Sequence, residues 1–182
     1  MQANIALGLI ETSSIAKGLE TLDAMCKAAG VNPEIHQAIS KGKYIIVISG
    51  TVGEVESALA KGAEIAGGTV VSRSIIRNVH SGALAALNKK VKGETLGAVG
   101  MVETKEALPA LFAADAAAKA AFVHVAEVNT GKGIGGKGYF TVTGEVGAVR
   151  TAVAAGVKAI GEDAVVSRIV IPNAHEHLGA AL

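Results

Sequence analysis

The sequence predicts a protein of the α/β (α+β) class that contains two copies of one small unit, each with helices packed on a sheet. The first observation is a tandem internal repeat. The second is the order of patterns in each copy, β-α-β-β-α-β followed by a short helix, which is a split βαβ layout. The third is composition: 50% of the residues are apolar but only 3% are aromatic, so Ala, Val, Ile and Leu must form the core.

The repeat extends over nearly the whole chain. Three pairs of matching segments are separated by 92, 92 and 95 positions: Ala6–Thr12 with Ala98–Thr104, Asp23–Ala28 with Asp115–Ala120, and Val70–Arg73 with Val165–Arg168. A unit of this length has the size of a small domain. We therefore predict domains at residues 1–90 and 94–182, joined by a short basic link near Asn88–Gly93.

In the first unit, Ala6–Thr12 carries the apolar pattern of a strand, and the residues that follow it can cap a helix. One helical stripe within this helix is predicted to face the core, and it contains Ile15, Leu19, Leu22 and Cys26. Residues 31–39 and 43–49 then form two strands joined by the short loop Ser40–Gly42.

The unit ends with a second helix, a fourth strand and a short helix. Thr51 and Glu54 have the spacing of a capping box at the start of the second helix. The fourth strand is expected at residues 70–76, and the closing helix at 81–87. The second unit repeats this order, but its first helix has Pro109 in the first turn and its second helix lacks the capping box.

The glycine-rich stretch Gly131–Gly138 resembles two phosphate-binding motifs, G-x-G-x-x-G and most of G-x-x-x-x-G-K-[ST]. Both motifs bind phosphate at the N-terminus of a helix. Here the run Tyr139–Thr143 is aromatic and β-branched, which predicts a strand. We therefore interpret the stretch as a hairpin loop, two residues longer than its counterpart in the first unit.

Charge and cysteine content exclude several classes of function. With 17 basic and 16 acidic residues, the chain shows no electrostatic footprint for nucleic acid or for an anionic membrane. No apolar run reaches the ~18 residues needed to span a bilayer, and no signal peptide is recognised, which favours a soluble cytoplasmic protein. Cys26 is the single cysteine, so neither an internal disulfide nor a zinc site of paired cysteines can form.

Residues that could support catalysis have structural interpretations. His175 and His177 lack a third ligand nearby in the sequence, so we expect no metal site. Glu11 and Glu103 could be an acid–base pair. Because each recurs beside a threonine in its own unit, we interpret both as structural. We expect no enzymatic activity and no cofactor.

Several repeated motifs together resemble bacterial microcompartment shell proteins of the tandem-domain type. They are Gly8–Thr12 and Gly100–Thr104, the Asp-Ala-x-x-Lys helices with Lys27 and Lys119, the loop Ile39–Gly42, Gly144–Val149 and Ile171–His175. The resemblance is to the single-layer trimers of the propanediol-utilisation kind. It implies two ferredoxin-like domains per chain, and a flat, pseudohexameric homotrimer in a microcompartment shell in the cytoplasm.

The resemblance also implies site residues and partners. Ser40, Lys41 and Gly42 would line a central pore together with Ile134, Gly135, Gly136 and Lys137. Lys27, Lys119, Asn78 and Asn173 would lie at the tile edges. The partners would be hexameric and pentameric shell proteins and encapsulated enzymes, with no nucleic acid and no membrane.

Two departures from the family pattern alter these expectations. Some of its trimers hold an iron–sulfur cluster on a pore-loop cysteine, but this chain has Ser40 there, so no cluster is expected. Asn78 and Asn173 stand where the family's edge motif has arginine.

Two functions follow as hypotheses. The first is a structural shell tile whose pore passes small polar metabolites, with Lys41, Lys43, Lys132 and Lys137 favouring anions. The alternative is a trimeric ferredoxin-like regulatory protein that binds a ligand between subunits.

Overall fold

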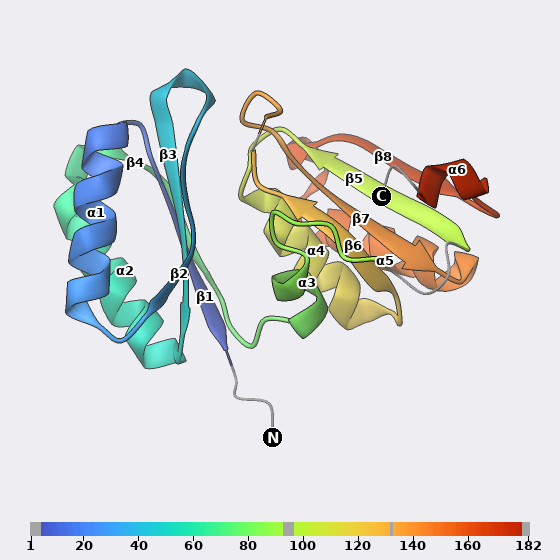
Figure 1. Cartoon of the computed structure of the whole chain (residues 1–182), viewed down its shortest axis with the longest axis horizontal. Helices are drawn as coiled ribbons and strands as arrows, with labels where there is room; N and C mark the ends of the chain where they lie inside the picture. Colours follow the sequence, from blue (N-terminus) through green and yellow to red (C-terminus); the bar gives the residue numbers. More distant parts are fainter. Residues whose placement is uncertain (1–4, 93–96, 132, 180–182) are drawn as a thin grey trace. The chain divides into compact units, whose positions relative to one another are not determined.

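A computed structural model of the chain describes residues 5–92, 97–131 and 133–179. The chain divides into two compact units between Val79 and His80 (Figure 1). The domain limits predicted from the repeat, 1–90 and 94–182, stay a prediction.

The first unit has the predicted order of strands and helices, with two helices on one face of its sheet (Figure 1). Its elements are β1 (Ala6–Thr12), α1 (Ile15–Ala28), β2 (Asn32–Ile39), the 3₁₀ turn η1 (Ser40–Gly42), β3 (Lys43–Gly50), α2 (Val52–Ala66), the 3₁₀ turn η2 (Gly67–Thr69) and β4 (Val70–Ile76). The predicted capping box is confirmed, because Thr51 and Glu54 exchange hydrogen bonds at the start of α2.

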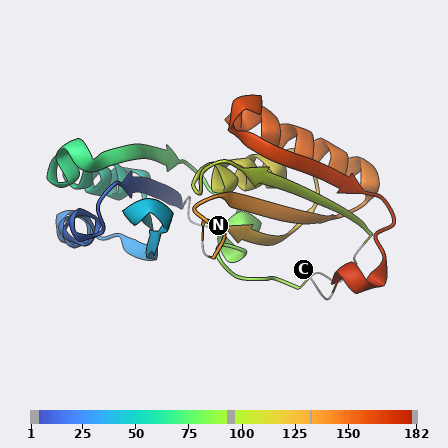
Figure 2. The same cartoon turned by 90° about the horizontal axis from the view of Figure 1, so that it is seen from above.

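The second unit begins with a short helix and then repeats the order of the first (Figure 2). Its elements are α3 (Ser81–Ala85), β5 (Ala98–Thr104), α4 (Pro109–Ala120), β6 (His124–Asn129), β7 (Gly138–Gly144), α5 (Val146–Ile160), the 3₁₀ turn η3 (Glu162–Ala164), β8 (Val165–Ile171) and α6 (Glu176–Gly179). At the start of α5 the carboxylate of Glu145 accepts two backbone N–H groups, which replaces the capping box.

Both sheets have four antiparallel strands in the same spatial order, β2-β3-β1-β4 and β6-β7-β5-β8. The first strand of each unit lies in the middle of its sheet and contains a glycine. A Cβ atom on Gly8 would lie 2.8 Å from Val55, and one on Gly100 would lie 2.7 Å from Val149. These glycines therefore let α2 and α5 approach their sheets closely. The predicted fold class is confirmed.

The predicted core stripe of α1 is wrong for three of its four residues, and only Leu22 packs against the core. Gly18, Thr21 and Met25 are buried against the unit, whereas Ile15 is 42% exposed, Leu19 is 53% exposed and Cys26 is exposed. Apolar residues occur on two neighbouring faces of this helix, and only one of these faces packs against the rest of the unit. An apolar strip on the other face is left open.

The short helix predicted to close the first unit packs on the second. α3 contacts α4 and β6, and the segment after it runs along the outer edge of β6. There Leu87 forms a parallel bridge with Val128. The sequence gives the position of the helix along the chain, whereas its packing partner depends on these contacts between distant residues.

Candidate functional site

The hairpin tip of the first unit is short and exposed. Ser40, Lys41 and Gly42 form the turn η1 between β2 and β3, and all three are exposed. Lys41 has φ 63° and Gly42 has φ 70°, both in the left-handed region, which is uncommon for a lysine. A Cβ atom on Gly42 would have no neighbour within 4 Å among the described residues. Lys41 has no ion-pair partner in the described part of the chain.

The corresponding tip of the second unit is longer and rich in glycine. It joins β6 to β7, so the predicted hairpin loop is confirmed. A phosphate-binding motif of either kind would be followed by a helix, but here the loop is followed by strand β7. Gly131, Gly133, Gly135 and Gly136 all have positive φ, between 72° and 91°. At the tip Gly135 and Lys137 are exposed, Ile134 is partly exposed and Gly136 is buried. Lys132 lies outside the described residues.

An ion pair holds the base of each tip. Lys43 Nζ lies 2.8 Å from the carboxylate of Glu11, and Lys137 Nζ lies 2.9 Å from that of Glu103. The four residues occupy equivalent positions in the two units. Glu11 and Glu103 therefore balance the charge of the lysines, which supports the structural interpretation of both carboxylates.

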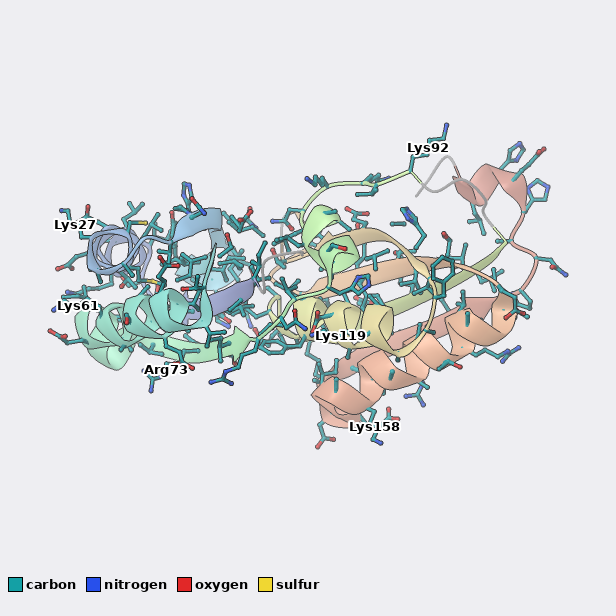
Figure 3. The ribbon with its side chains drawn as sticks, turned by 90° about the horizontal axis from the view of Figure 1, so that it is seen from below. Lys27, Lys61, Arg73, Lys92, Lys119 and Lys158 are labelled. Carbon is teal, nitrogen blue, oxygen red and sulfur yellow. The ribbon has the colours of Figure 1, made fainter. Side chains whose placement is uncertain are left out.

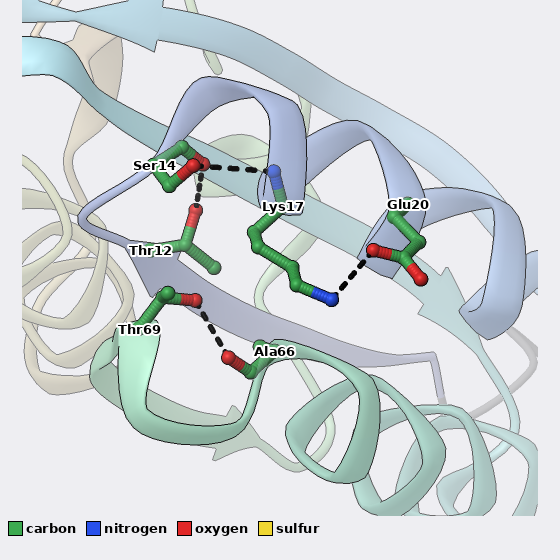
Figure 4. A network of polar contacts seen from close by, with 6 residues as sticks. All are labelled: Thr12, Ser14, Lys17, Glu20, Ala66 and Thr69. Carbon is green, nitrogen blue, oxygen red and sulfur yellow. Dashed lines mark hydrogen bonds and ion pairs between the residues drawn. The ribbon is translucent and has the colours of Figure 1, made fainter.

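The threonine beside each glutamate fixes the turn into the following helix (Figure 4). Thr12 Oγ1 donates to the carbonyl oxygen of Ser14 at 2.9 Å, and Ser14 Oγ accepts the backbone N–H of Lys17 at 3.3 Å. In the second unit Thr104 Oγ1 donates to the carbonyl oxygen of Glu106 at 2.7 Å. The repeated Glu-Thr pair thus closes the strand and starts the helix.

The two predicted edge lysines lie near the C-terminal ends of α1 and α4 (Figure 3). Each pairs with the aspartate one turn earlier, Lys27 with Asp23 and Lys119 with Asp115, both at 2.6 Å. The surroundings differ, because the Lys27 side chain is 74% exposed and that of Lys119 is 39% exposed.

The two predicted edge asparagines are exposed and adopt the same unusual conformation. Asn78 has φ 54° and Asn173 has φ 47°. Asparagine tolerates the left-handed region better than most residues with a Cβ atom. The chain therefore turns in the same way after β4 and after β8.

Cys26 lies on α1 and not at either tip. Partial desolvation and then the negative charge of Asp23 raise the pKa of its thiol, which keeps the less reactive thiol form. Nδ1 of His175 accepts the backbone N–H of His177, so this imidazole caps α6. Among the described residues no group of three potential metal ligands occurs. None of the helices in the described part of the chain has the length and hydropathy of a membrane span.

Comparison with known proteins identifies the family. The model of the BMC domain matches residues 6–79 and again residues 98–174. The bacterial microcompartment shell protein PduT of Citrobacter freundii is 39% identical over 174 residues, which are 95% of this chain and 95% of PduT. The major carboxysome shell protein CsoS1A of Halothiobacillus neapolitanus is 44% identical over 80 residues, covering 42% of this chain and 82% of CsoS1A.

A solved structure agrees over the full length. The crystal structure of a microcompartment protein from Desulfitobacterium hafniense DCB matches with a TM-score of 0.90 and 38% identity, covering 98% of this chain and 99% of that one. The resemblance inferred from the repeated motifs is confirmed. The chain belongs to the BMC-domain family of bacterial microcompartment shell proteins and carries two of these domains in tandem.

Proposed function

We propose that three copies of this shell protein close into a flat ring of six domains that tiles a shell facet around a central pore. The observation that carries the proposal is the tandem pair of BMC domains with the same strand order and with a hairpin tip at the same place in each. Most soluble homo-oligomers have closed symmetry, and a threefold ring is one such closed form. A threefold ring of two-domain chains presents the two tips alternately around its axis.

The residues at the tips suit a narrow pore. Ser40, Lys41 and Gly42 would alternate around it with the loop residues Ile134, Gly135, Gly136 and Lys137. Glycines without Cβ atoms let the backbones of neighbouring copies approach closely. Four glycines with positive φ shape the longer tip, and these are conformations that most other residues adopt only with strain.

Among the described lysines at the tips, Lys41 would contribute most to the pore charge. The ion pairs with Glu11 and Glu103 offset the charges of Lys43 and Lys137. Lys41 lacks such a partner among the described residues, so a trimer would present three uncompensated positive charges at its axis. Charged rings select ions in narrow pores, and this ring would favour small anionic metabolites.

The outer edges would join other shell proteins. Lys27 and Lys119, with the turns at Asn78 and Asn173, are exposed and polar, and this favours contacts with neighbouring hexamers and pentamers. Encapsulated enzymes are further proposed partners. The relatives are named as shell proteins, and we propose that this chain likewise has no enzymatic activity.

The ring is tested by mass and by microscopy. Native mass measurement should give three times 18.2 kDa, about 55 kDa, and electron microscopy should show sheets or tubes at raised protein concentration. A discrete trimer that never forms sheets would favour the ligand-binding regulator instead. A monomer at all concentrations would refute the ring.

The pore is tested by changing the sign of its charge. Lys41→Glu should reduce anion flux into assembled shells, because three negative charges would replace three positive ones. Lys61→Glu, which reverses a charge on α2, is the control and should leave flux unchanged. Equal anion flux in wild-type and Lys41→Glu shells would exclude Lys41 from the pore.

A further inference from the structure

In the second unit the short helix α3 packs against α4 and β6. The backbone N–H of His80 donates to Asp115 Oδ1 at 2.8 Å, and the other oxygen of Asp115 pairs with Lys119. The His80 imidazole Nδ1 accepts the backbone N–H of Gly82 at 3.1 Å, which caps α3. The aspartate of α4 therefore anchors the start of α3.

The residues after α3 extend this contact to the edge of the sheet. The backbone N–H of Val128 donates to the carbonyl oxygen of Ala86 at 2.9 Å, and that of Asn88 donates to the carbonyl oxygen of Val128 at 2.7 Å. Segment 80–88 therefore covers both a face of α4 and the outer edge of β6.

The sequence of segment 80–87 recurs as residues 175–182 at the end of the second unit. His175 matches His80, and its Nδ1 accepts the backbone N–H of His177 at 3.3 Å, as that of His80 does in α3. The first turns close on the histidine carbonyl in both helices, through the backbone N–H of Leu178 at 2.8 Å in α6 and that of Leu84, one residue further along, at 3.1 Å in α3. The sequence Ala85-Ala86-Leu87 also returns as Ala180-Ala181-Leu182.

The receiving surface recurs in the first unit, where it is uncovered. Asp23 pairs with Lys27 as Asp115 does with Lys119, but the Asp23 side chain is 62% exposed and that of Asp115 is 9% exposed. Leu19 is 53% exposed, whereas its counterpart Leu111 is fully buried.

The outer edge of β2 is open as well. In the described part of the chain, no backbone hydrogen bond from another element reaches this edge, which corresponds to the covered edge of β6. An open sheet edge is a ready surface for a further segment of chain.

We propose that residues 175–182 of one copy dock on α1 and β2 of a second copy, with the backbone N–H of His175 donating to the carboxylate of Asp23. α3 follows β4 and docks on the BMC domain that comes next in the chain. α6 follows β8 in the same way, and the next BMC domain after it would be the first one of another copy. The inference rests on the proposed ring, in which three such contacts join the chains. Lys119 stays 39% exposed beside docked α3, so docking leaves Lys27 available at the tile edge.

The first test is the stability of the trimer against dilution. Asp23→Ala should raise the concentration at which the trimer dissociates by about tenfold or more, because it removes a charge-assisted hydrogen bond from each contact. Deleting residues 175–182 should do at least the same, and Asp23→Ala should add little to the deletion. Glu64→Ala, which breaks an exposed ion pair on α2, is the matched control and should not change dissociation.

The second test is hydrogen exchange at the His36 amide, the counterpart of Val128 on β2. In the trimer this amide should be protected, and in the chain lacking residues 175–182 it should exchange about tenfold faster or more. A protein that is never trimeric would refute the proposed ring and this contact together. A trimer whose dissociation and His36 exchange are unchanged by both variants would overturn this inference and leave the ring standing.

Discussion

The packing of α1 on the start of β3 gives a sharp prediction about the support of the first hairpin tip. A Cβ atom on Gly18 would lie 2.5 Å from Cδ1, and 2.6 Å from Cβ and Cγ, of Tyr44. Separations below 3.0 Å force a shift, and Tyr44 Cβ is held by the strand that begins next to the tip. Gly18→Ala should therefore destabilise the first unit by about 1–3 kcal/mol, the usual cost of overpacking.

A double-mutant cycle isolates this contact. In a Tyr44→Gly background the three close atoms are gone, and alanine is better than glycine inside a helix by about 1 kcal/mol. Gly18→Ala should then become stabilising, which gives a coupling energy of about 2–4 kcal/mol. The second unit already has the reversed arrangement, because Ala110 replaces the glycine and Gly138 replaces the tyrosine, and a Cβ atom on Gly138 would lie 2.7 Å from that of Ala110.

Differential scanning calorimetry at one fixed protein concentration is the assay, since assembly also shifts the melting temperature. For a domain of this size, 1 kcal/mol corresponds to about 4–8 °C. Gly138→Ala supplies a reciprocal measurement in the second unit, where it too should lower the melting temperature. The packing argument fails if Gly18→Ala has the same effect with and without Tyr44.

Three further predictions concern helix starts and a partly buried tyrosine. Gly53→Ala should stabilise α2 by about 0.5–1 kcal/mol, measured by urea denaturation, because its Cβ atom would meet nothing within 4 Å among the described residues. Two backbone N–H groups hold the pKa of Glu145 below its ordinary 4.5, so the stability lost in Glu145→Gln should be seen at neutral pH and vanish as pH falls through the folded-state pKa in thermal scans. Burial, and then a hydrogen bond to a neighbouring glutamate, raise the pKa of Tyr139, so its phenol absorbance should titrate above 10.0 and Tyr139→Phe should remove that step.

The sequence was sufficient for the fold because its signals are local. Strand patterns, the capping residues of α2 and the two-residue lengthening at Gly131–Gly138 each depend on neighbouring positions. The repeat then strengthened every assignment by showing it twice. The core face of α1 is predicted only in part, because periodicity alone does not separate the buried face from the open strip with Leu19.

The site was predicted less completely because its contacts join distant positions. The lysines next to the tips could be found in the sequence, but their pairing with Glu11 and Glu103 depends on β1 and β3, or β5 and β7, lying side by side. The pairing changes the electrostatic hypothesis, since it leaves Lys41 as the described tip lysine whose charge no carboxylate offsets. The available signal is a Glu and a Lys that recur in both units, although the longer second tip places them two positions further apart there.

Because two domains are fused in one chain, their hairpin tips can differ in sequence and can contribute differently to the proposed pore. The ion pair at the base recurs in both units, Glu11 with Lys43 and Glu103 with Lys137, so it serves a need common to both. The segments beyond it differ in length and glycine content. In a ring of six identical domains any change at a tip would appear six times, whereas in the proposed trimer each change appears three times, in alternation with another loop. One tip can therefore change in length or composition while the other stays the same, so the short tip and the longer glycine-rich tip can meet different requirements of the proposed pore.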